Sequence, residues 1–279
     1  MLVAAGLGAC APLTPYRYTG ITPSAHPIAW DGYPAHAGEV HLEGTFQHTE
    51  VAENWFPQVH DTALEVAATS VEARASITPV RGLDIGVHVA FADESWTEPT
   101  AVGTLPLATH GTLFGIGPEL RGAFFLDHEH HAALGIAASA MLYRVPWTGY
   151  ALGAGCNDLS SNGDGCYTPM SSGADSDWVL QAGIYPSYSF GPDGKYGTLF
   201  GVIGVHTSFK NDGFAVTASN GSTIEEDGFV PYFGGGYGIH AQYIHANVMA
   251  FLPVSIDSTS WGPGVMVTLG VDLPLWHKR

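Results

Sequence analysis

Alternation between large apolar and small or polar side chains runs along most of this chain, and residues 81–93 (RGLDIGVHVAFAD) show it in its simplest form. Every odd position from Leu83 to Phe91 carries a large apolar side chain, and the positions between them carry Asp, Gly, His or Ala. Successive side chains of a β-strand point to opposite faces, so the pattern predicts a strand with one apolar face. That face must contact either a protein core or lipid.

Ten segments share this period of two. Each is long enough to be a strand. The pattern therefore predicts an all-β protein. The strands are expected at about 39–50, 66–79, 81–93, 112–126, 132–146, 177–190, 197–210, 228–239, 243–254 and 264–275.

The connections between the predicted strands are alternately long and short. Bacterial outer-membrane β-barrels have an even number of strands, short turns at one end, long loops at the other, and strands that are apolar outside and polar inside. The chain resembles these proteins over residues 39–276. The resemblance implies an antiparallel up-and-down transmembrane β-barrel of about ten strands, with short periplasmic turns and long extracellular loops. An even strand count also predicts that both chain ends lie in the periplasm.

Composition favours lipid over a protein core as the partner of the apolar face. Only 13% of the residues are charged and nine are Lys or Arg, whereas 46% are hydrophobic. A soluble β-sandwich or barrel needs a charged exterior, which this chain cannot supply. No apolar run reaches the roughly 18–20 residues of a membrane-spanning helix. The net charge of −17 argues against nucleic acid as a partner.

The first ten residues, MLVAAGLGAC, end in a sequence that resembles the lipobox of bacterial lipoproteins. The resemblance implies a signal segment at 1–10 and a lipid on Cys10; a secretory signal with a chance cysteine is the alternative. Cys156 and Cys166 bracket a polar loop, which in an exported protein predicts a disulfide and leaves Cys10 unpaired. Residues 11–38 contain five Pro and predict a periplasmic tether before a barrel domain at 39–276.

Polar side chains on the second face of the strands are expected to fill the barrel lumen. Eight strands enclose an interior just filled by side chains and sixteen or more leave a channel, so ten predict a largely plugged lumen. Two Glu-x-Arg pairs are interpreted as ties across it, because an unpaired buried charge costs several kcal/mol; a solute-selecting constriction is the alternative. The predicted lumen network consists of Glu72, Arg74, Asp84, His88, Glu119, Arg121, Gln181, Tyr185, His245, Asn247 and Asp272.

These features predict an outer-membrane barrel with a structural, surface-interaction or restricted small-solute role. Its expected partners are outer-membrane lipid and small solutes or extracellular ligands, and no cofactor is predicted. The alternative is a barrel enzyme, a lipid or peptide hydrolase with its site at the extracellular rim. No Gly-x-Ser-x-Gly nucleophile motif occurs. The residues expected near that rim are His48, His60, Asp61, Asp93 and His110.

Two polar stretches contain residue types that can bind metal ions. The His-rich stretch at 127–131 (DHEHH) is interpreted as a solvated periplasmic turn rather than a metal site. Residues 158–163 have the Asp-x-Ser-x-Asn-Gly spacing that begins a calcium loop, but Pro169 occupies the position of the final Glu ligand. An EF-hand-like site is therefore excluded, and a degenerate surface calcium site remains as the alternative to a disulfide-closed turn.

Overall fold

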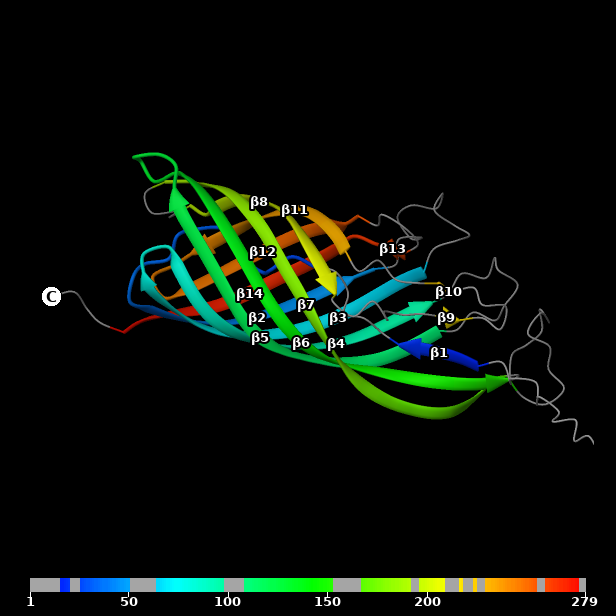
Figure 1. The fold of residues 1–279 in the computed structure, drawn as a ribbon. Coiled ribbons are helices and arrows are strands. Elements are labelled where there is room, and N and C mark those ends of the chain that lie inside the picture. The colour runs from blue at the N-terminus through cyan, green and yellow to red at the C-terminus, as the bar shows by residue number, and fades with distance from the viewer. Residues whose placement is uncertain are drawn as a thin grey trace, which may run out of the picture.

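Ten long antiparallel strands form a closed barrel in the computed structural model (Figure 1). Each strand pairs with the next along the chain, and the last pairs with the first in an eleven-residue register from Gly264↔Thr49 to Pro274↔Glu39. The prediction of an all-β up-and-down barrel with about ten strands is confirmed. The strands are β2 (Glu39–Thr49), β3 (Leu64–Val80), β4 (Leu83–Thr97), β5 (Ala108–Phe125), β6 (Ala132–Leu152), β7 (Tyr167–Ser189), β8 (Thr198–Ser208), β11 (Phe229–His240), β12 (Ile244–Pro253) and β14 (Gly264–Pro274).

The structure describes residues 16–20, 26–50, 64–97, 108–152, 167–191, 196–208, 216–217, 223–224, 229–254 and 259–275. Four short strands lie at the long-loop end of the barrel (Figure 1). They are β1 (Tyr16–Gly20) on β6, β13 (Thr259–Trp261) on β3, and the hairpin of β9 (Val216–Thr217) and β10 (Thr223–Ile224). Within the described residues, no helix is long and apolar enough to cross a membrane.

The β6–β7 hairpin is longer than the sequence pattern predicted. Strands were expected to end near 146 and to resume near 177, but pairing continues to Leu152↔Tyr167, and β1 adds a further strand there. Residues 171–176 of this extension are exposed on both faces. A strand that is hydrated on both faces has no reason to alternate in polarity, so the period of two marks only the part of the hairpin that faces lipid.

The outer surface of the barrel is apolar over its middle. Large hydrophobic side chains on all ten strands are exposed, including Ile203 at 69% and Leu269 at 62%. The odd residues of the opening stretch lie on this face, with Phe91 at 56%. An apolar exterior on a sheet that closes on itself, so that none of the ten barrel strands has an unpaired edge, is typical of a membrane-spanning barrel. The apolar face of the opening stretch therefore touches lipid.

The short turns are tight, and one of them requires glycine. Gly82, between β3 and β4, has a φ of +75°, and a Cβ added there would lie 2.1 Å from the carbonyl oxygen of Ala123. Two backbone hydrogen bonds hold the turn: the amide of Ala123 donates to the carbonyl oxygen of Gly82, and the amide of Gly82 donates to the carbonyl oxygen of Ala35. The short connections between β3 and β4, β5 and β6, β7 and β8, and β11 and β12 all start and finish at one end of the barrel.

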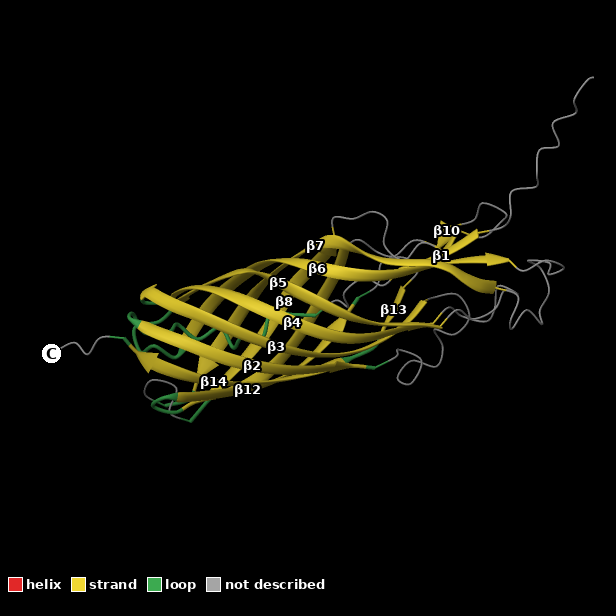
Figure 2. Ribbon diagram, turned by 90° about the horizontal axis from the view of Figure 1, so that it is seen from below, coloured by secondary structure: helices red, strands yellow, loops and turns green. Residues whose placement is uncertain are grey.

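Residues 26–34, called the lumen segment below, lie inside the barrel, where a tether had been expected. All nine residues are buried. The Tyr185 hydroxyl on β7 donates to the carbonyl of Ile28 (2.8 Å), and His240 Nε2 on β11 lies 2.5 Å from Asp31 Oδ2. Contacts to different parts of the wall place the segment within the lumen, and Figure 2 shows this loop between the strands.

The lumen segment separates the two ends of the described chain. The start of β2 at Glu39 and the end of β14 at Pro274 do lie together at the short-turn end, as an even strand count requires. However, β1 pairs with residues 147–151 of β6 at the opposite end. Because the chain crosses the lumen before β2 begins, an even number of strands does not determine at which end of the barrel residues 16–20 lie. The expectation that the N-terminal part lies beside the C-terminus is corrected for residues 16–20.

Candidate functional site in the barrel lumen

One side of the lumen is packed as a hydrophobic core around the lumen segment. Trp30 packs on Tyr185 of β7 with ring centroids 5.4 Å apart, and no side chain larger than hydrogen fits at Gly135 of β6, where a Cβ would lie 2.7 Å from the indole ring. The apolar cluster consists of Ile28, Ala29, Trp30, Ala137, Tyr185, Phe200, Val202, Tyr232, Met249, Phe251 and Met266. The lumen at this level is therefore filled by packed side chains.

A buried charge network lines the opposite wall, on β2 to β5. Arg121 of β5 donates from Nη1 and Nη2 to the two oxygens of Glu43 on β2 (3.1 and 3.0 Å) and from Nε to Glu119 Oε1 (2.5 Å). Its guanidinium carbon also lies 5.8 Å from the ring centroid of Trp30. An arginine paired in this way holds the strands at a fixed spacing, because its planar guanidinium can donate only to carboxylates in certain positions.

Arg74 of β3 completes the network. Its Nη1 donates to Glu43 Oε1 (3.1 Å), and Nε forms an ion pair at 2.7 Å with Glu119 Oε1. Nη2 lies 3.7 Å from Asp84 Oδ2 on β4, and His88 Nδ1 lies 2.9 Å from Glu119 Oε2. Two guanidinium groups and three carboxylates thus share one buried cluster, at most 9% exposed.

The two Glu-x-Arg pairs behave differently. Glu119 and Arg121 contact each other directly, whereas Arg74 does not pair with Glu72. Glu72 lies instead 3.5 Å from His26 Nε2 of the lumen segment. The arginines bind along one wall rather than across the lumen, because the lumen segment occupies the space between the walls.

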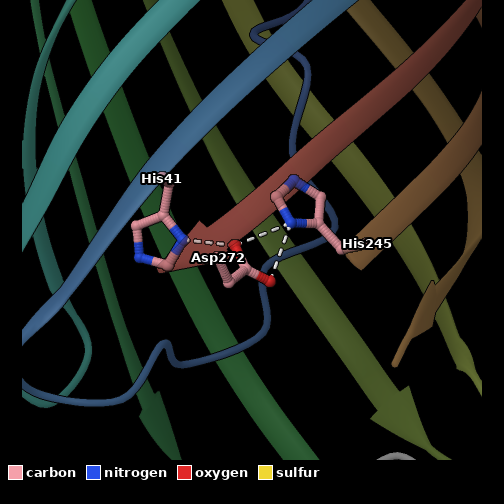
Figure 3. A group of neighbouring side chains, drawn as sticks. All are labelled: His41, His245 and Asp272. Carbon is pink, nitrogen blue, oxygen red and sulfur yellow. Dashed lines mark hydrogen bonds and ion pairs between the residues drawn. The ribbon is translucent and has the colours of Figure 1, made fainter. Parts of the chain in front are cut away.

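A second cluster lies where the barrel closes and is called the seam cluster below: His41 of β2, Asp272 of β14 and His245 of β12 (Figure 3). His41 Nδ1 lies 2.6 Å from Asp272 Oδ1, and His245 Nδ1 lies 2.9 and 3.0 Å from the two Asp272 oxygens. His41 and Asp272 are direct partners in the β2–β14 register. His245 reaches across Gly270, where a Cβ would lie 2.3 Å from its ring.

The outward nitrogens of both imidazoles also have partners. His41 Nε2 lies 2.8 Å from the Thr78 hydroxyl, which donates in turn to Asp84 Oδ1. His245 Nε2 lies 3.5 Å from Glu43 Oε1, so it touches the charge network. These partners orient both rings with Nδ1 toward Asp272.

A cavity of about 410 Å³ opens beside the seam cluster at the short-turn end. Exposed His36 and the turn residues Ala241 and Gln242 stand at its mouth. Its lining also includes the seam cluster, Arg121 and four further acids, Asp31, Glu39, Glu43 and Asp84. Its lining is therefore acidic, with histidines placed among the carboxylates.

The structure places all eleven predicted lumen residues on the inner face of the barrel. Six belong to the charge network or contact it, three lie against the lumen segment or near it, and Asn247 and Asp272 lie on the cavity wall. Sequence reasoning missed His41, Glu43 and Thr78 as members of these clusters, although all three have inward parity. Cys10, Cys156, Cys166 and the calcium-like stretch at 158–163 lie outside the described residues.

The remaining predicted polar groups do not converge. His48 and Asp93 lie on the outer face near the long-loop end, both beside Thr69 in the strand register, and His48 Nδ1 contacts the Thr69 hydroxyl at 3.0 Å. His60 and Asp61 lie outside the described residues. In the short turn, His130 stacks on Phe125 and His131 on Tyr188. Among the residues that the structure describes, only the seam cluster brings three potential metal ligands together.

No family model and no curated protein matches the chain. Solved structures that align with it include the transport unit of the autotransporter AIDA-I from Escherichia coli (TM-score 0.43, 9% identity, 84% of this chain and 88% of that chain). The translocator domain of autotransporter NalP from Neisseria meningitidis aligns with a TM-score of 0.44 at 11% identity, over 85% and 88%. The CymD monoaromatic hydrocarbon channel gives 0.33 at 10% identity, over 88% and 90%. None of these values assigns the chain to a family.

Proposed function

We propose that this protein is a bacterial outer-membrane barrel that its own N-terminal segment keeps closed, and that its role is structural or surface-interacting rather than that of a diffusion pore. The observation that carries the proposal is the buried lumen segment. Its side chains pack against β6, β7 and β11, while the charge network fills the wall from β2 to β5. A lumen filled from both sides leaves little room for water and solutes to pass.

The orientation follows from the lengths of the connections. In outer-membrane barrels the short turns face the periplasm and the long loops face outward. Applied to this chain, the rule puts the acidic cavity at the periplasmic end and β1 at the outer end. A role in surface interaction then rests on the long loops together with residues 16–20, which extend the β6–β7 hairpin beyond the lipid-facing belt. The lipid predicted on Cys10 would add a second membrane attachment.

Conductance of the purified protein in a planar bilayer tests the closed lumen. We expect the wild type to conduct poorly. Replacing residues 26–34 by a Gly-Ser stretch of equal length keeps the chain connected but removes the side chains that fill the lumen, and we expect conductance to rise. His36→Gln, at an exposed position beyond the buried stretch, serves as the matched control and should conduct like the wild type.

A large, steady wild-type conductance that the Gly-Ser replacement leaves unchanged would refute the closed barrel and favour a transport channel. A rise in conductance that occurs equally in His36→Gln would show that the lumen segment is not what closes the barrel. The enzyme alternative would rest on the described rim residues His48 and Asp93, which lie on the outer face on either side of Thr69, with His48 Nδ1 3.0 Å from the Thr69 hydroxyl.

A further inference from the structure

The structure assigns a second property to the periplasmic mouth of the barrel: we propose that His41, His245 and Asp272 bind one divalent transition-metal ion of the Zn²⁺ type. The inference does not depend on whether the barrel conducts. It rests on the donor atoms, on the partners behind them, on the charge around them and on the adjoining cavity.

The donor set suits such an ion. Two imidazole nitrogens and one carboxylate are typical ligands of Zn²⁺ and its neighbours, at about 2.0–2.2 Å. The three donor atoms already lie within 4.8 Å of one another. Tetrahedral coordination at those bond lengths separates ligand atoms by about 3.3 Å, so an ion requires shifts of about 1 Å. Figure 3 shows both imidazoles turned toward the Asp272 carboxylate from opposite sides.

The groups behind the ligands have the arrangement that metal sites use. Metal-bound histidines usually donate their second ring N–H to an oxygen, which fixes the ring and makes the free nitrogen a better ligand. The Thr78 hydroxyl donates to Asp84, so it is left to accept from His41 Nε2. Glu43 Oε1 stands in the same relation to His245 Nε2 at 3.5 Å. Both rings are therefore held with Nδ1 directed at the proposed ion.

The surrounding charge favours a divalent cation. Glu43, Asp84, Glu119 and Asp272 carry four negative charges within one connected cluster. When the neighbouring histidines are neutral, as metal ligation requires of His41 and His245, Arg74 and Arg121 supply only two positive charges, and buried charges that are not matched are costly. A bound divalent ion would balance the remaining two negative charges.

The cavity provides access and an open coordination position. It extends from the seam cluster to the mouth at exposed His36 and the 241–243 turn, so an ion can enter from the short-turn end. Three protein ligands leave a fourth position for water or for a solute from the cavity. Asp31 and His240 line the same cavity and pair with each other at 2.5 Å, and the His240 ring centroid lies 5.9 Å from that of His245.

The site would also act on the barrel itself. Its ligands come from β2, β12 and β14, and the β2–β14 pair is the seam that closes the barrel. An ion bound there would fasten the first and last strands of the barrel to each other. We therefore expect metal to raise the temperature at which the barrel opens, in addition to occupying the cavity.

Metal binding to the full-length protein in detergent tests the proposal. The chelator-treated protein would be dialysed against Zn²⁺ and its metal counted by mass spectrometry, and Co²⁺ would be added separately to record its visible spectrum. We expect one Zn²⁺ per chain in the micromolar range or tighter, and a Co²⁺ spectrum of mixed nitrogen and oxygen coordination. Removing a second-shell partner typically weakens metal binding by 10–100-fold, so His245→Gln and Asp272→Asn, which remove ligands, should weaken it by about 100-fold or more.

Two controls separate this site from adventitious binding. His36→Gln removes an imidazole at the cavity mouth, and the triple variant His128→Gln, His130→Gln, His131→Gln removes the His-rich turn; both should bind like the wild type. Heat-modifiable gel mobility reports whether each variant is folded. Absence of stoichiometric Zn²⁺ in the wild type overturns the proposal without any variant. So does binding that survives in His245→Gln or that disappears in the turn variant.

Discussion

Removal of Arg121 should destabilise the barrel strongly, because Arg74 would be the one guanidinium left to pair with two buried carboxylates. In Arg121→Ala, Glu43 loses two hydrogen bonds of 3.1 and 3.0 Å, and Glu119 loses its contact at 2.5 Å. Breaking a buried ion pair by deleting one partner costs about 3–5 kcal/mol. Loss of the cation above the Trp30 ring adds roughly 0.5–1 kcal/mol. We expect the free energy of unfolding to fall by about 4 kcal/mol.

The assay is urea unfolding of the protein in lipid vesicles, followed by tryptophan fluorescence and gel mobility. Arg144→Ala is the matched control, since Arg144 is exposed and its loss should change stability by no more than about 0.5 kcal/mol. Adding Glu119→Gln to Arg121→Ala removes one of the two carboxylates that then share Arg74, and should restore roughly 1–3 kcal/mol. If Arg121→Ala costs less than about 1 kcal/mol, like the control, the charge network is not a buried electrostatic unit and the reasoning is wrong.

Three further predictions concern the turns, the lipid face and the leader. Gly82→Ala should lower the free energy of unfolding by at least about 1–2 kcal/mol, because φ is positive at this residue and the new Cβ would meet a carbonyl oxygen. Gly44→Ala is the control: Gly44 has open space around it, so the substitution should be nearly neutral in the same unfolding assay. Ile203→Lys, at the middle of β8, should cost about 2–4 kcal/mol in vesicles, whereas Ile239→Lys, next to a short turn, should cost about 0–1 kcal/mol; equal costs would contradict the membrane belt. Mass spectrometry of the mature protein should find acyl groups on Cys10, and a free N-terminus at another residue would rule the lipid out.

The strands could be predicted because lipid on one side and a filled lumen on the other impose opposite chemistry on neighbouring residues. From Leu83 to Phe91 this contrast is complete, and the strand was found where the alternation put it. The contrast vanishes beyond the membrane. Hence the pairing between Leu152 and Tyr167 was not foreseen, although the alternation of long and short connections was.

The lumen segment was missed because proline content dominated its interpretation. Ile28, Ala29 and Trp30 form an apolar patch that a solvated tether would not need. A second signal lay in the strands. Phe200, Val202, Tyr232, Met249, Phe251 and Met266 have inward parity and are large and apolar, so parts of β8, β11, β12 and β14 are apolar on both faces. A strand of that kind needs an apolar partner inside the barrel, and the lumen segment is that partner.

The seam cluster lay beyond sequence reasoning for a different reason. His41 and Asp272 are 231 residues apart, and they become neighbours only when β14 pairs with β2. A shift of that register by one residue would turn one of the two side chains to the outer face. Parity identified Asp272 and His245 as lumen residues, but only the closing register could bring His41 to them.

The lumen segment also constrains the order in which the molecule can be assembled. It joins β2 directly, while β1, on its other side, is paired at the far end of the barrel. Once β14 has paired with β2, the lumen segment with Trp30 and Tyr33 would have to be threaded through a closed barrel whose opposite wall carries Arg74 and Arg121. The segment must therefore be in place while the sheet is still an open ribbon, with the ribbon curling around it and the C-terminal strand arriving last. An assembly intermediate trapped before that final pairing should already protect residues 26–34 from protease, although its β2 and β14 edges are still free.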